Sequence, residues 1–335
     1  MLRVTTILLL LGVMAGCKQN QPPITRIAFG SCSNQDNPVQ MWKDILLQKP
    51  ELWILLGDNI YADTHDMAVM RSQYEKQKSN ADYQKLINSC ITIGTWDDHD
   101  YGINDGGKSF SKKEESKEEF LRFIGSPVVD SVRTHEGVYS SHTYGSGKKK
   151  IKVILLDTRT FRDTIFSSSI SGRKYEPNPE GDILGEQQWQ WLEKEFRNSD
   201  ASIHIIGSSI QFISDEHSWE KWGNFPLAKE RMIKLLVKYN VKIPIIISGD
   251  RHATDISKIE LPGLDSPLYD FTSSGLTHVW PDPTQVESNK YRVGHQIVKT
   301  NFGMLLIDWS GDKPVVTMEK RGHDNQLFES HSTAE

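Results

Sequence analysis

Short apolar runs alternate with segments of helical periodicity through most of the chain. Val39, Trp42, Ile45 and Leu46 fall on one helical face, and further helices are predicted around 189–196 and over 227–239. Apolar runs of strand length occupy 26–30, 52–56, 91–95, 152–156, 203–206 and 243–247, with two more at 270–274 and 301–308. The repeated change of period predicts an α/β layered fold.

The segment 104–150 departs from this pattern. It contains Gly106-Gly107, a charged run over Lys112–Glu119 and three lysines at 148–150. We interpret the charged run as the solvated face of a helix. No internal repeat or change of composition divides the chain, so a single domain is predicted.

The 335 residues include 39 Lys+Arg and 44 Asp+Glu, a formal net charge of −5, and 37% are apolar. This is the composition of a globular protein that buries a substantial core. A general nucleic-acid binder would show a basic excess, so we expect no nucleic-acid partner. The negative net charge does not exclude an anionic substrate, because bound cations can supply local positive charge. We expect a monomer.

The amino terminus, MLRVTTILLLLGVMAGC, has the features of a secretory signal. Arg3 precedes a short apolar stretch over Ile7–Val13, which is too short to span a membrane as a helix. The run Met14-Ala15-Gly16-Cys17 resembles a bacterial lipobox, in which Cys17 becomes the lipid attachment site. The alternative is a plain signal peptide with an incidental cysteine.

These features divide the chain into a lipoprotein-type signal peptide over 1–16, a tether over 17–24 and the folded domain over 25–325. The polar tether joins the lipid to the domain. We expect the protein to be exported, held at the cell envelope and in contact with the membrane through its lipid alone.

Three cysteines are too few for a disulfide framework. Cys32 and Cys90 remain in the mature chain, and thiols of exported proteins tend to oxidise. One expectation is therefore a Cys32–Cys90 disulfide. The other is that Cys32 binds a metal.

Polar side chains suited to metal binding follow the predicted strands at the points where these end. Ligands of open α/β sheets bind at the carboxyl ends of strands, where the loops converge. Carboxylates that come so close repel one another unless cations or protons separate them. A polynuclear metal site is therefore predicted from Cys32, Asp58, Asn59, Tyr61, Asp97, Asp98, His99, Asp250 and His252.

The ordered motifs of the chain resemble those of the PhoD-like alkaline phosphatases, in the calcineurin-like metallophosphoesterase superfamily. They occur in family order between about residues 26 and 252 and read Phe29-Gly30-Ser31-Cys32, Gly57-Asp58-Asn59-Ile60-Tyr61, Trp96-Asp97-Asp98-His99-Asp100-Tyr101-Gly102, Leu156-Asp157-Thr158-Arg159 and Ser248-Gly249-Asp250-Arg251-His252. The resemblance implies an αββα fold, a β-sandwich flanked by helices.

The resemblance also implies two metal ions. Asp98 stands where the wider superfamily has Asn and Asp250 where it has His, and such hard oxygen ligands favour calcium. The other half of the site has Cys32, Tyr61 and His252, a set that suits ferric iron. Asp58 would bridge Fe³⁺ and Ca²⁺, with Asp97 a further ligand candidate and Zn²⁺ or Mn²⁺ the alternative metals.

The implied reaction is attack on phosphorus by a water molecule that the metal ions activate. His99 matches the position that contacts phosphate and protonates the leaving oxygen, with Asp63 or Asp100 orienting its ring. Arg159 is a candidate for phosphate contact, with a structural ion pair to Asp157 as the alternative. Asn59 is a further candidate for positioning phosphate, and Arg162 and Arg251 are weaker ones.

Several other residues have settings that sequence does not decide. His278 and His295 have neighbours suited to a site, although structural roles are more common for such histidines. Trp219, Trp222 and Trp280 are candidates for a pocket wall. The superfamily's additional histidine motif has no match after strand 203–206, and Gln211 is the candidate to replace it.

These features predict an exported, metal-dependent phosphatase (alkaline phosphatase D-like) that hydrolyses phosphate monoesters, best at alkaline pH. The same site chemistry serves a phosphodiesterase or phospholipase-like hydrolase. A third hypothesis is a non-catalytic surface lipoprotein that binds glycan or polymer, but it gives no reason for Asp58, Asp98, Asp250 and His252 to occur together.

Overall fold

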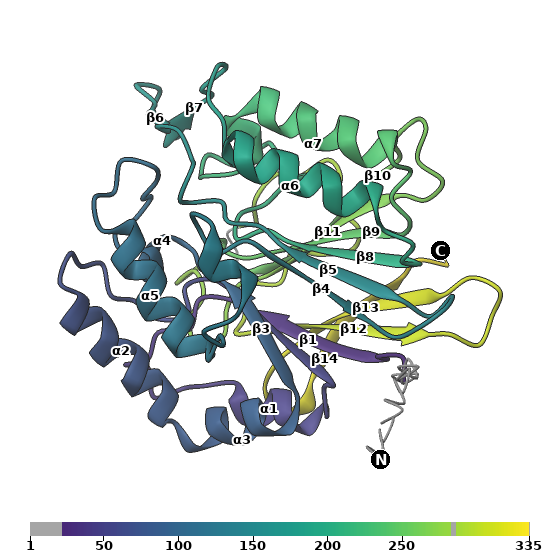
Figure 1. Ribbon diagram of the computed structural model, residues 1–335, viewed down its shortest axis with the longest axis horizontal. Coiled ribbons are helices and arrows are strands. Elements are labelled where there is room, and N and C mark those ends of the chain that lie inside the picture. The colour runs from purple at the N-terminus through teal and green to yellow at the C-terminus, as the bar shows by residue number, and fades with distance from the viewer. Residues whose placement is uncertain (1–21, 283–285, 335) are drawn as a thin grey trace, which may run out of the picture.

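Two six-stranded mixed sheets lie face to face in the computed structural model, which describes residues 22–282 and 286–334, and helices cover both outer faces (Figure 1). The first sheet has the order β14-β13-β12-β1-β2-β3. Its strands are β1 (Arg26–Gly30), β2 (Leu52–Leu56), β3 (Ile91–Thr95), β12 (Phe302–Asp308), β13 (Val315–Arg321) and β14 (Leu327–Ser332). The strands β1, β2 and β3 are parallel, and β1 pairs on its other side with antiparallel β12.

The second sheet has the order β10-β11-β9-β8-β5-β4. Its strands are β4 (Ser140–Tyr144), β5 (Ile151–Leu155), β8 (Ile203–Gly207), β9 (Pro244–Ser248), β10 (Thr254–Ile259) and β11 (Leu268–Ser273). The four inner strands β5, β8, β9 and β11 are parallel, whereas β4 and β10 run antiparallel at the two edges.

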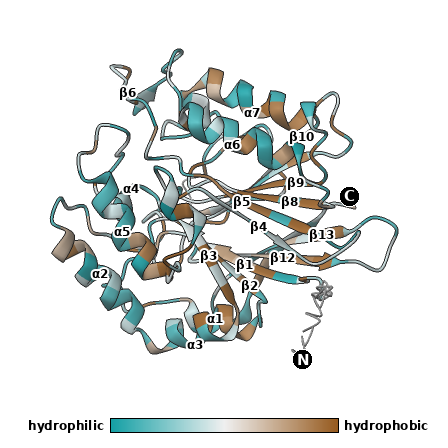
Figure 2. Ribbon diagram, in the orientation of Figure 1, coloured by the Kyte–Doolittle hydropathy of each residue, from teal (hydrophilic) through white to brown (hydrophobic). Residues whose placement is uncertain are grey.

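Alternation along the strands builds three apolar layers. In β1, Ile27 and Phe29 point between the sheets, whereas Ala28 faces the helices on the outer side. Parallel strands covered on both faces read as continuous apolar runs for this reason. Figure 2 shows hydrophobic strands in the middle of the molecule and polar surfaces on the outer helices.

The helices divide between the two outer faces. The first sheet is covered by α1 (Trp42–Leu47), α2 (Met67–Ser79), α3 (Ala81–Ser89) and α5 (Lys113–Ile124), with the single turn α4 (Asp98–Tyr101) directly after β3. The second sheet is covered by α6 (Gly185–Arg197) and α7 (Pro226–Lys238). Smaller elements are the hairpin β6 (Phe166–Ser167) and β7 (Tyr175–Glu176), and the 3₁₀ turns η1 (Ser131–Thr134), η2 (Trp222–Asn224) and η3 (His323–Asn325).

The predicted α/β sandwich in one domain is confirmed, and three predicted strands have the predicted bounds. The interpretation of the charged run is partly wrong, because α5 buries Lys117 and Glu119 together with its apolar face. Glu119 accepts from Arg71 and Arg122, and Lys117 donates to a backbone carbonyl. The inner face of this helix thus includes one carboxylate paired with arginines and one lysine bonded to the backbone.

The predicted Cys32–Cys90 disulfide is wrong, since both cysteines are free. Cys32 follows the end of β1, whereas Cys90 precedes β3, and the parallel pairing places these points at opposite ends of the sheet. Cys32 is therefore available as a ligand.

The predicted signal peptide and Cys17 lie outside the described residues. Within the described ranges, none of the helices has the length and apolar character needed to cross a bilayer.

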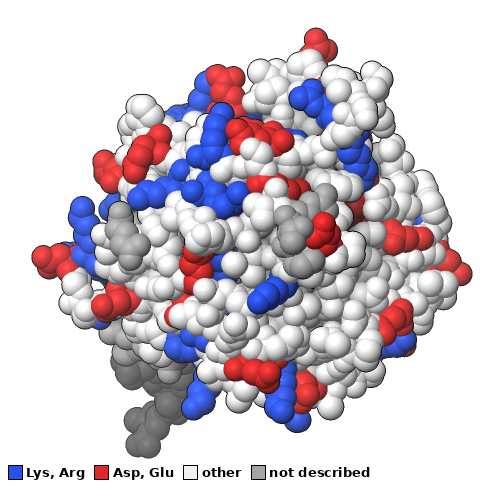
Figure 3. Space-filling view, turned by 180° about the vertical axis from the view of Figure 1, so that it is seen from behind, with Lys and Arg blue, Asp and Glu red and all other residues white. Residues whose placement is uncertain are grey.

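Acidic and basic side chains are interspersed on the molecular face in Figure 3.

Candidate metal centre and active site

Polar side chains from four strand ends meet at one end of the sandwich. Cys32 follows β1, Asp58 follows β2, Asp98 follows β3, and Asp250 and His252 follow β9. Three groups have ligand atoms within 4.8 Å of one another: Cys32, Asp58 and His252; Asp58, Asp98 and His99; and Asp97, Asp98 and Asp250. The sequence prediction that these residues lie together is thus consistent with the fold.

Four of the predicted ligands have left-handed backbone conformations. Their φ angles are 61° at Cys32, 48° at Asp58, 64° at Asp250 and 49° at His252. Residues with a β-carbon pay about 1–3 kcal/mol for such conformations, which accumulate at functional sites. The sharp turns aim the side chains inward immediately after each strand.

The first half of the site combines sulfur, oxygen and nitrogen donors. Cys32 Sγ and the Tyr61 hydroxyl each lie 3.3 Å from Asp58 Oδ2, and the same hydroxyl lies 3.3 Å from His252 Nε2. Ser274, which the sequence analysis missed, lies 3.0 Å from Cys32 Sγ and accepts from the His252 backbone N–H. Only its position beside β1 in the folded sheet brings it here.

The second half of the site is built from carboxylates. Asp97, Asp98 and Asp250 provide oxygen atoms only, which suits a hard cation. Asp58 belongs to both halves, because its Oδ2 faces Cys32 and Tyr61 while its Oδ1 accepts the backbone N–H of His99 at 3.3 Å. Asp58 therefore lies between the two halves of the candidate site.

Burial is the main cause of the pKa shifts of these side chains. Burial raises the pKa of Asp58 well above its usual range, that of Asp250 to about 7 and that of the Cys32 thiol to about 11. Burial also lowers the pKa of His252 to about 3, so its imidazole is neutral. Cations would favour the ionised carboxylates and thiolate, so this donor set fits two bound metal ions.

His99 lines the cavity above these ligands, and Asp63 orients its ring. Asp63 Oδ2 lies 2.7 Å from His99 Nδ1, and the ring of Tyr61 lies 4.2 Å from that of His99. Burial alone would lower the pKa of His99, but the carboxylates of Asp58, Asp63 and Asp98 outweigh it and raise this pKa to about 10. Asp100 instead accepts backbone N–H groups of Asp58 and Asp97.

Arg159 occupies a different position from the one expected of a phosphate-binding residue. Its guanidinium is 0% exposed and lies 2.5 Å from Asp97 and 2.6 Å from Glu220, whereas Asp157 accepts only its backbone N–H. Burial alone would raise the pKa of Asp98, but Arg159 and His99 lower it to about 2. This position beneath the ligands suits holding Asp97 and Asp98 rather than contacting phosphate.

Asn59 and Gln211 also have structural surroundings. The Asn59 amide donates to Thr95 O at 3.0 Å and to Asp100 Oδ2 at 2.6 Å, so both of its N–H groups are used. Gln211 donates to the Thr272 hydroxyl at 2.7 Å. Neither residue lines the cavity, and the side-chain oxygen of each is buried without a hydrogen-bond partner among the described residues.

A cavity of about 190 Å³ opens over the ligands. Besides Asp58, Asp98, His99, Asp250 and His252, it is lined by Asn104, Asp105, Lys174, Trp219, Glu220, Arg251 and Trp280. Two of the three candidate tryptophans are thus at the site, whereas Trp222 is buried under the second sheet and donates to Ser208.

His278 is a site residue that the sequence analysis ranked below a structural role. Its ring lies 4.5 Å from that of His252 and 5.2 Å from that of Tyr61. His295 is 85% exposed and pairs with Glu329, away from the ligands. No local signal separates these two histidines, because tertiary contacts alone place them.

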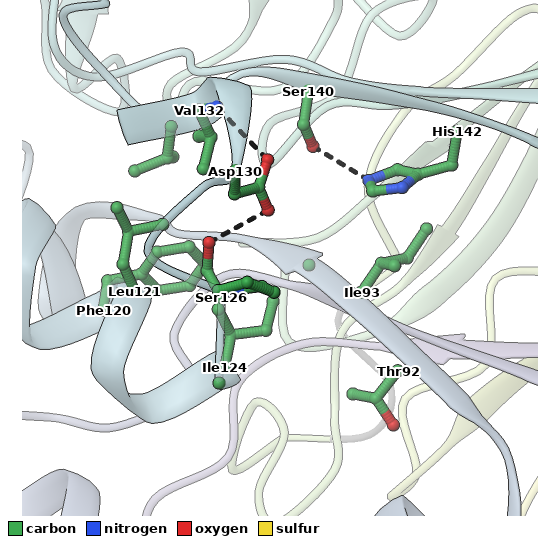
Figure 4. A pocket seen from close by; sticks show the side chains of 14 residues that line it. Thr92, Ile93, Phe120, Leu121, Ile124, Ser126, Asp130, Val132, Ser140 and His142 are labelled. Atoms are coloured by element: carbon green, nitrogen blue, oxygen red, sulfur yellow. Dashed lines mark hydrogen bonds between the residues drawn. The ribbon is translucent and has the colours of Figure 1, made fainter. Parts of the chain in front are cut away.

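A second cavity, of about 200 Å³, lies between β3, β4 and α5 (Figure 4). Its lining is mainly apolar, with Asp130 bonded to Ser126 and His142 to Ser140. It shares no lining residue with the cavity over the metal ligands. The donor groups that suit metal chemistry belong to the first cavity.

A two-sheet sandwich with thiol, carboxylate, phenol and imidazole groups converging at its strand ends defines a candidate binuclear metal site. The chain belongs to the PhoD-like phosphatase family, whose sequence profile matches residues 27–308. It is 25% identical over 290 residues to alkaline phosphatase D of Bacillus subtilis (strain 168), a match that covers 72% of this chain and 48% of that protein. The chain therefore spans about half the length of this curated relative.

Solved structures show the same fold. The structure of PhoD superposes with a TM-score of 0.69 at 18% identity, covering 93% of this chain and 70% of the other. GAP50, described as the anchor in the inner membrane complex of Plasmodium, superposes with a TM-score of 0.58 at 12% identity, covering 92% and 88%. At such identities the likeness extends to the fold alone.

Proposed function

We propose that this protein is a metal-dependent phosphatase that hydrolyses phosphate monoesters outside the cytoplasm. The convergence of Cys32, Asp58, Asp98, Asp250 and His252 at one end of the sandwich, where all of them but Cys32 line one cavity, is the observation that carries the proposal. Membership of the PhoD-like phosphatase family and the similarity to alkaline phosphatase D support the reaction class.

The residues fit an iron–calcium pair. Cys32, Tyr61 and His252 would hold Fe³⁺, the carboxylates Asp98 and Asp250 with Asp97 would hold Ca²⁺, and Asp58 would bridge the two. Metal ions held by these residues would supply positive charge beside the phosphoryl group and lower the pKa of a water molecule. Zn²⁺ or Mn²⁺ are the alternatives.

His99 and Asp63 are the residues proposed for the proton transfer to the leaving oxygen. Asp63 holds His99 by Nδ1, so the opposite nitrogen, Nε2, is the one that donates a proton to the leaving oxygen. Asp63 both orients the ring and favours its protonated form. His99→Asn should keep its metals and lose turnover; loss of the metals as well would reassign His99 to metal binding.

Residues 1–16 are proposed as the signal peptide, 17–24 as the tether and 25–325 as the phosphatase domain. Lipid on Cys17 would hold a monomeric enzyme at the cell envelope. Mass spectrometry of the mature amino terminus tests the attachment: an acylated Cys17 is expected, and an unmodified terminus at another residue would contradict it.

The experiment that tests the function is metal analysis of protein purified without chelator, combined with turnover of p-nitrophenyl phosphate before and after chelation. We expect iron near one equivalent and activity that calcium restores. Greater activity on bis-p-nitrophenyl phosphate would indicate a phosphodiesterase instead. Absence of metal and turnover would favour a non-catalytic, binding role.

A further inference from the structure

The cavity over the metal ligands contains one buried arginine, Arg251. It lies between the proposed ligands Asp250 and His252 and is only 2% exposed. Lys174, the only lysine in the described lining, is 39% exposed and pairs with Asp105, and His99 is held by Asp63. Of these arginine and lysine side chains, Arg251 is thus the less solvent-exposed.

The hydrogen bonds of Arg251 leave part of its guanidinium available. Nη2 pairs with Glu287, and Nη1 lies 3.8 Å from Asp250 Oδ2, too far for a hydrogen bond. Nε is buried and has no hydrogen-bond partner among the residues that the structure describes. A buried donor without an acceptor costs about 1–3 kcal/mol, so an acceptor is expected to reach it during function.

Two indole rings fix the guanidinium in place. Its central carbon lies 5.4 Å from the ring centroid of Trp219 and 5.5 Å from that of Trp280, and the two rings lie 5.1 Å apart. Trp280 also contacts the His252 ring at 5.5 Å. The cation is therefore held beside a proposed metal ligand before any substrate arrives, which is the preorganisation that electrostatic catalysis requires.

We propose that Arg251 binds the phosphoryl group of the substrate, with its free N–H donors on a phosphoryl oxygen and Glu287, Trp219 and Trp280 holding its plane. This assignment rests on the proposed phosphatase function. The planar guanidinium suits phosphate oxygens and stays charged at alkaline pH. Arg159 is unsuited to this role, because carboxylates engage its buried guanidinium outside the cavity lining.

The test compares Arg251→Met, Arg251→Lys and Arg231→Met in metal-loaded enzyme. Arg231 is a matched control, since it also stacks on a tryptophan, Trp189 at 4.9 Å, and pairs with a glutamate, Glu186 at 2.7 Å. Arg251→Met should lower kcat/KM by about 10²–10³-fold, the usual effect of removing one preorganised donor. It should also weaken inhibition by inorganic phosphate, with metal content unchanged.

Further readouts separate this role from a structural one. The loss should be equal for p-nitrophenyl phosphate and β-glycerophosphate, because Arg251 contacts the group common to both. Arg251→Lys should restore part of the activity, and Arg231→Met should behave as wild type. A double variant, Arg251→Met with Glu287→Gln, avoids leaving the partly buried Glu287 carboxylate without its ion-pair partner and should show the same kinetic defect.

Unchanged phosphate inhibition and kcat/KM in a folded Arg251→Met enzyme would overturn the assignment. Loss of metal from that variant would also overturn it, because Arg251 would then act by positioning Asp250. Isothermal titration of inorganic phosphate into wild type and variant measures the contact without turnover. An inactive wild-type enzyme that still holds metals and binds phosphate through Arg251 would refute the phosphatase function alone.

Discussion

Asp250 destabilises the folded chain when no cation accompanies it. Burial raises the pKa of this carboxyl from 3.8 to about 7, although the neighbouring Arg251 guanidinium opposes the shift. The folded state thus binds the proton more tightly than the unfolded state does. The free energy of unfolding of chelated protein should therefore fall as pH rises from about 4 through 7, and the full penalty should apply above pH 7.

The pKa difference sets the size of the effect. About three pH units at 1.36 kcal/mol each give an upper limit of about 4 kcal/mol. Asp250→Asn removes the charge, so at pH 8 we expect the chelated variant to be about 2–4 kcal/mol more stable than the chelated wild type. At pH 4 the difference between the two should be less than about 1 kcal/mol. With metals bound the order should reverse, because the variant loses a ligand and the stabilisation that binding provides.

Urea unfolding followed by tryptophan fluorescence, with and without chelator, measures both orders of stability. Asp312→Asn is the control, because Asp312 lies in the exposed turn between β12 and β13 and its removal changes net charge equally. A chelated Asp250→Asn variant no more stable than wild type at pH 8 would refute the reasoning. If Asp312→Asn raised the free energy of unfolding equally, the effect would be due to net charge and not to the burial of Asp250.

Three further predictions test other parts of the structure. Gly57→Ala would place a Cβ 2.4 Å from that of Asp97 and would force alanine to adopt a φ of +96°. Thermal unfolding should therefore show a free energy of unfolding lower by about 2–5 kcal/mol. Burial lowers the pKa of His204 to about 4, so the free energy of unfolding should fall by up to about 3 kcal/mol between pH 6.5 and pH 4. In urea titrations, His204→Asn should reduce this dependence on pH. Cys32→Ser should lower iron content but leave calcium, as read by elemental analysis; unchanged iron would make Cys32 structural.

The sequence was sufficient for the parts of the site that local order determines. Asp58 and Asp98 each follow a short apolar run closely, so strand prediction alone places them at one edge of a sheet. The same reasoning reaches Asp250 and His252 after β9. Parallel strands covered on both faces give unbroken apolar runs, which makes their ends easy to recognise.

What escaped prediction depends on contacts between distant segments. One of the two carboxylate partners of Arg159 is Glu220, 61 residues further along the chain, and no local sequence pattern predicts this ion pair. Helix α2 buries only Met70, Tyr74 and Gln77, a stripe too narrow to register as amphipathic. Ser274 and His278 enter the site on the segment after β11, whose closeness to β1 arises only when the sheets assemble.

The first strand of the chain is an interior strand of its sheet, with β2 on one side and β12 on the other. Arg26 pairs with Leu306, so this sheet cannot close until the ribosome has synthesised the chain as far as β12. Until then β1 presents apolar side chains and an unpaired backbone edge, which promote aggregation. The yield of soluble protein should thus be set by how the nascent chain is protected during synthesis.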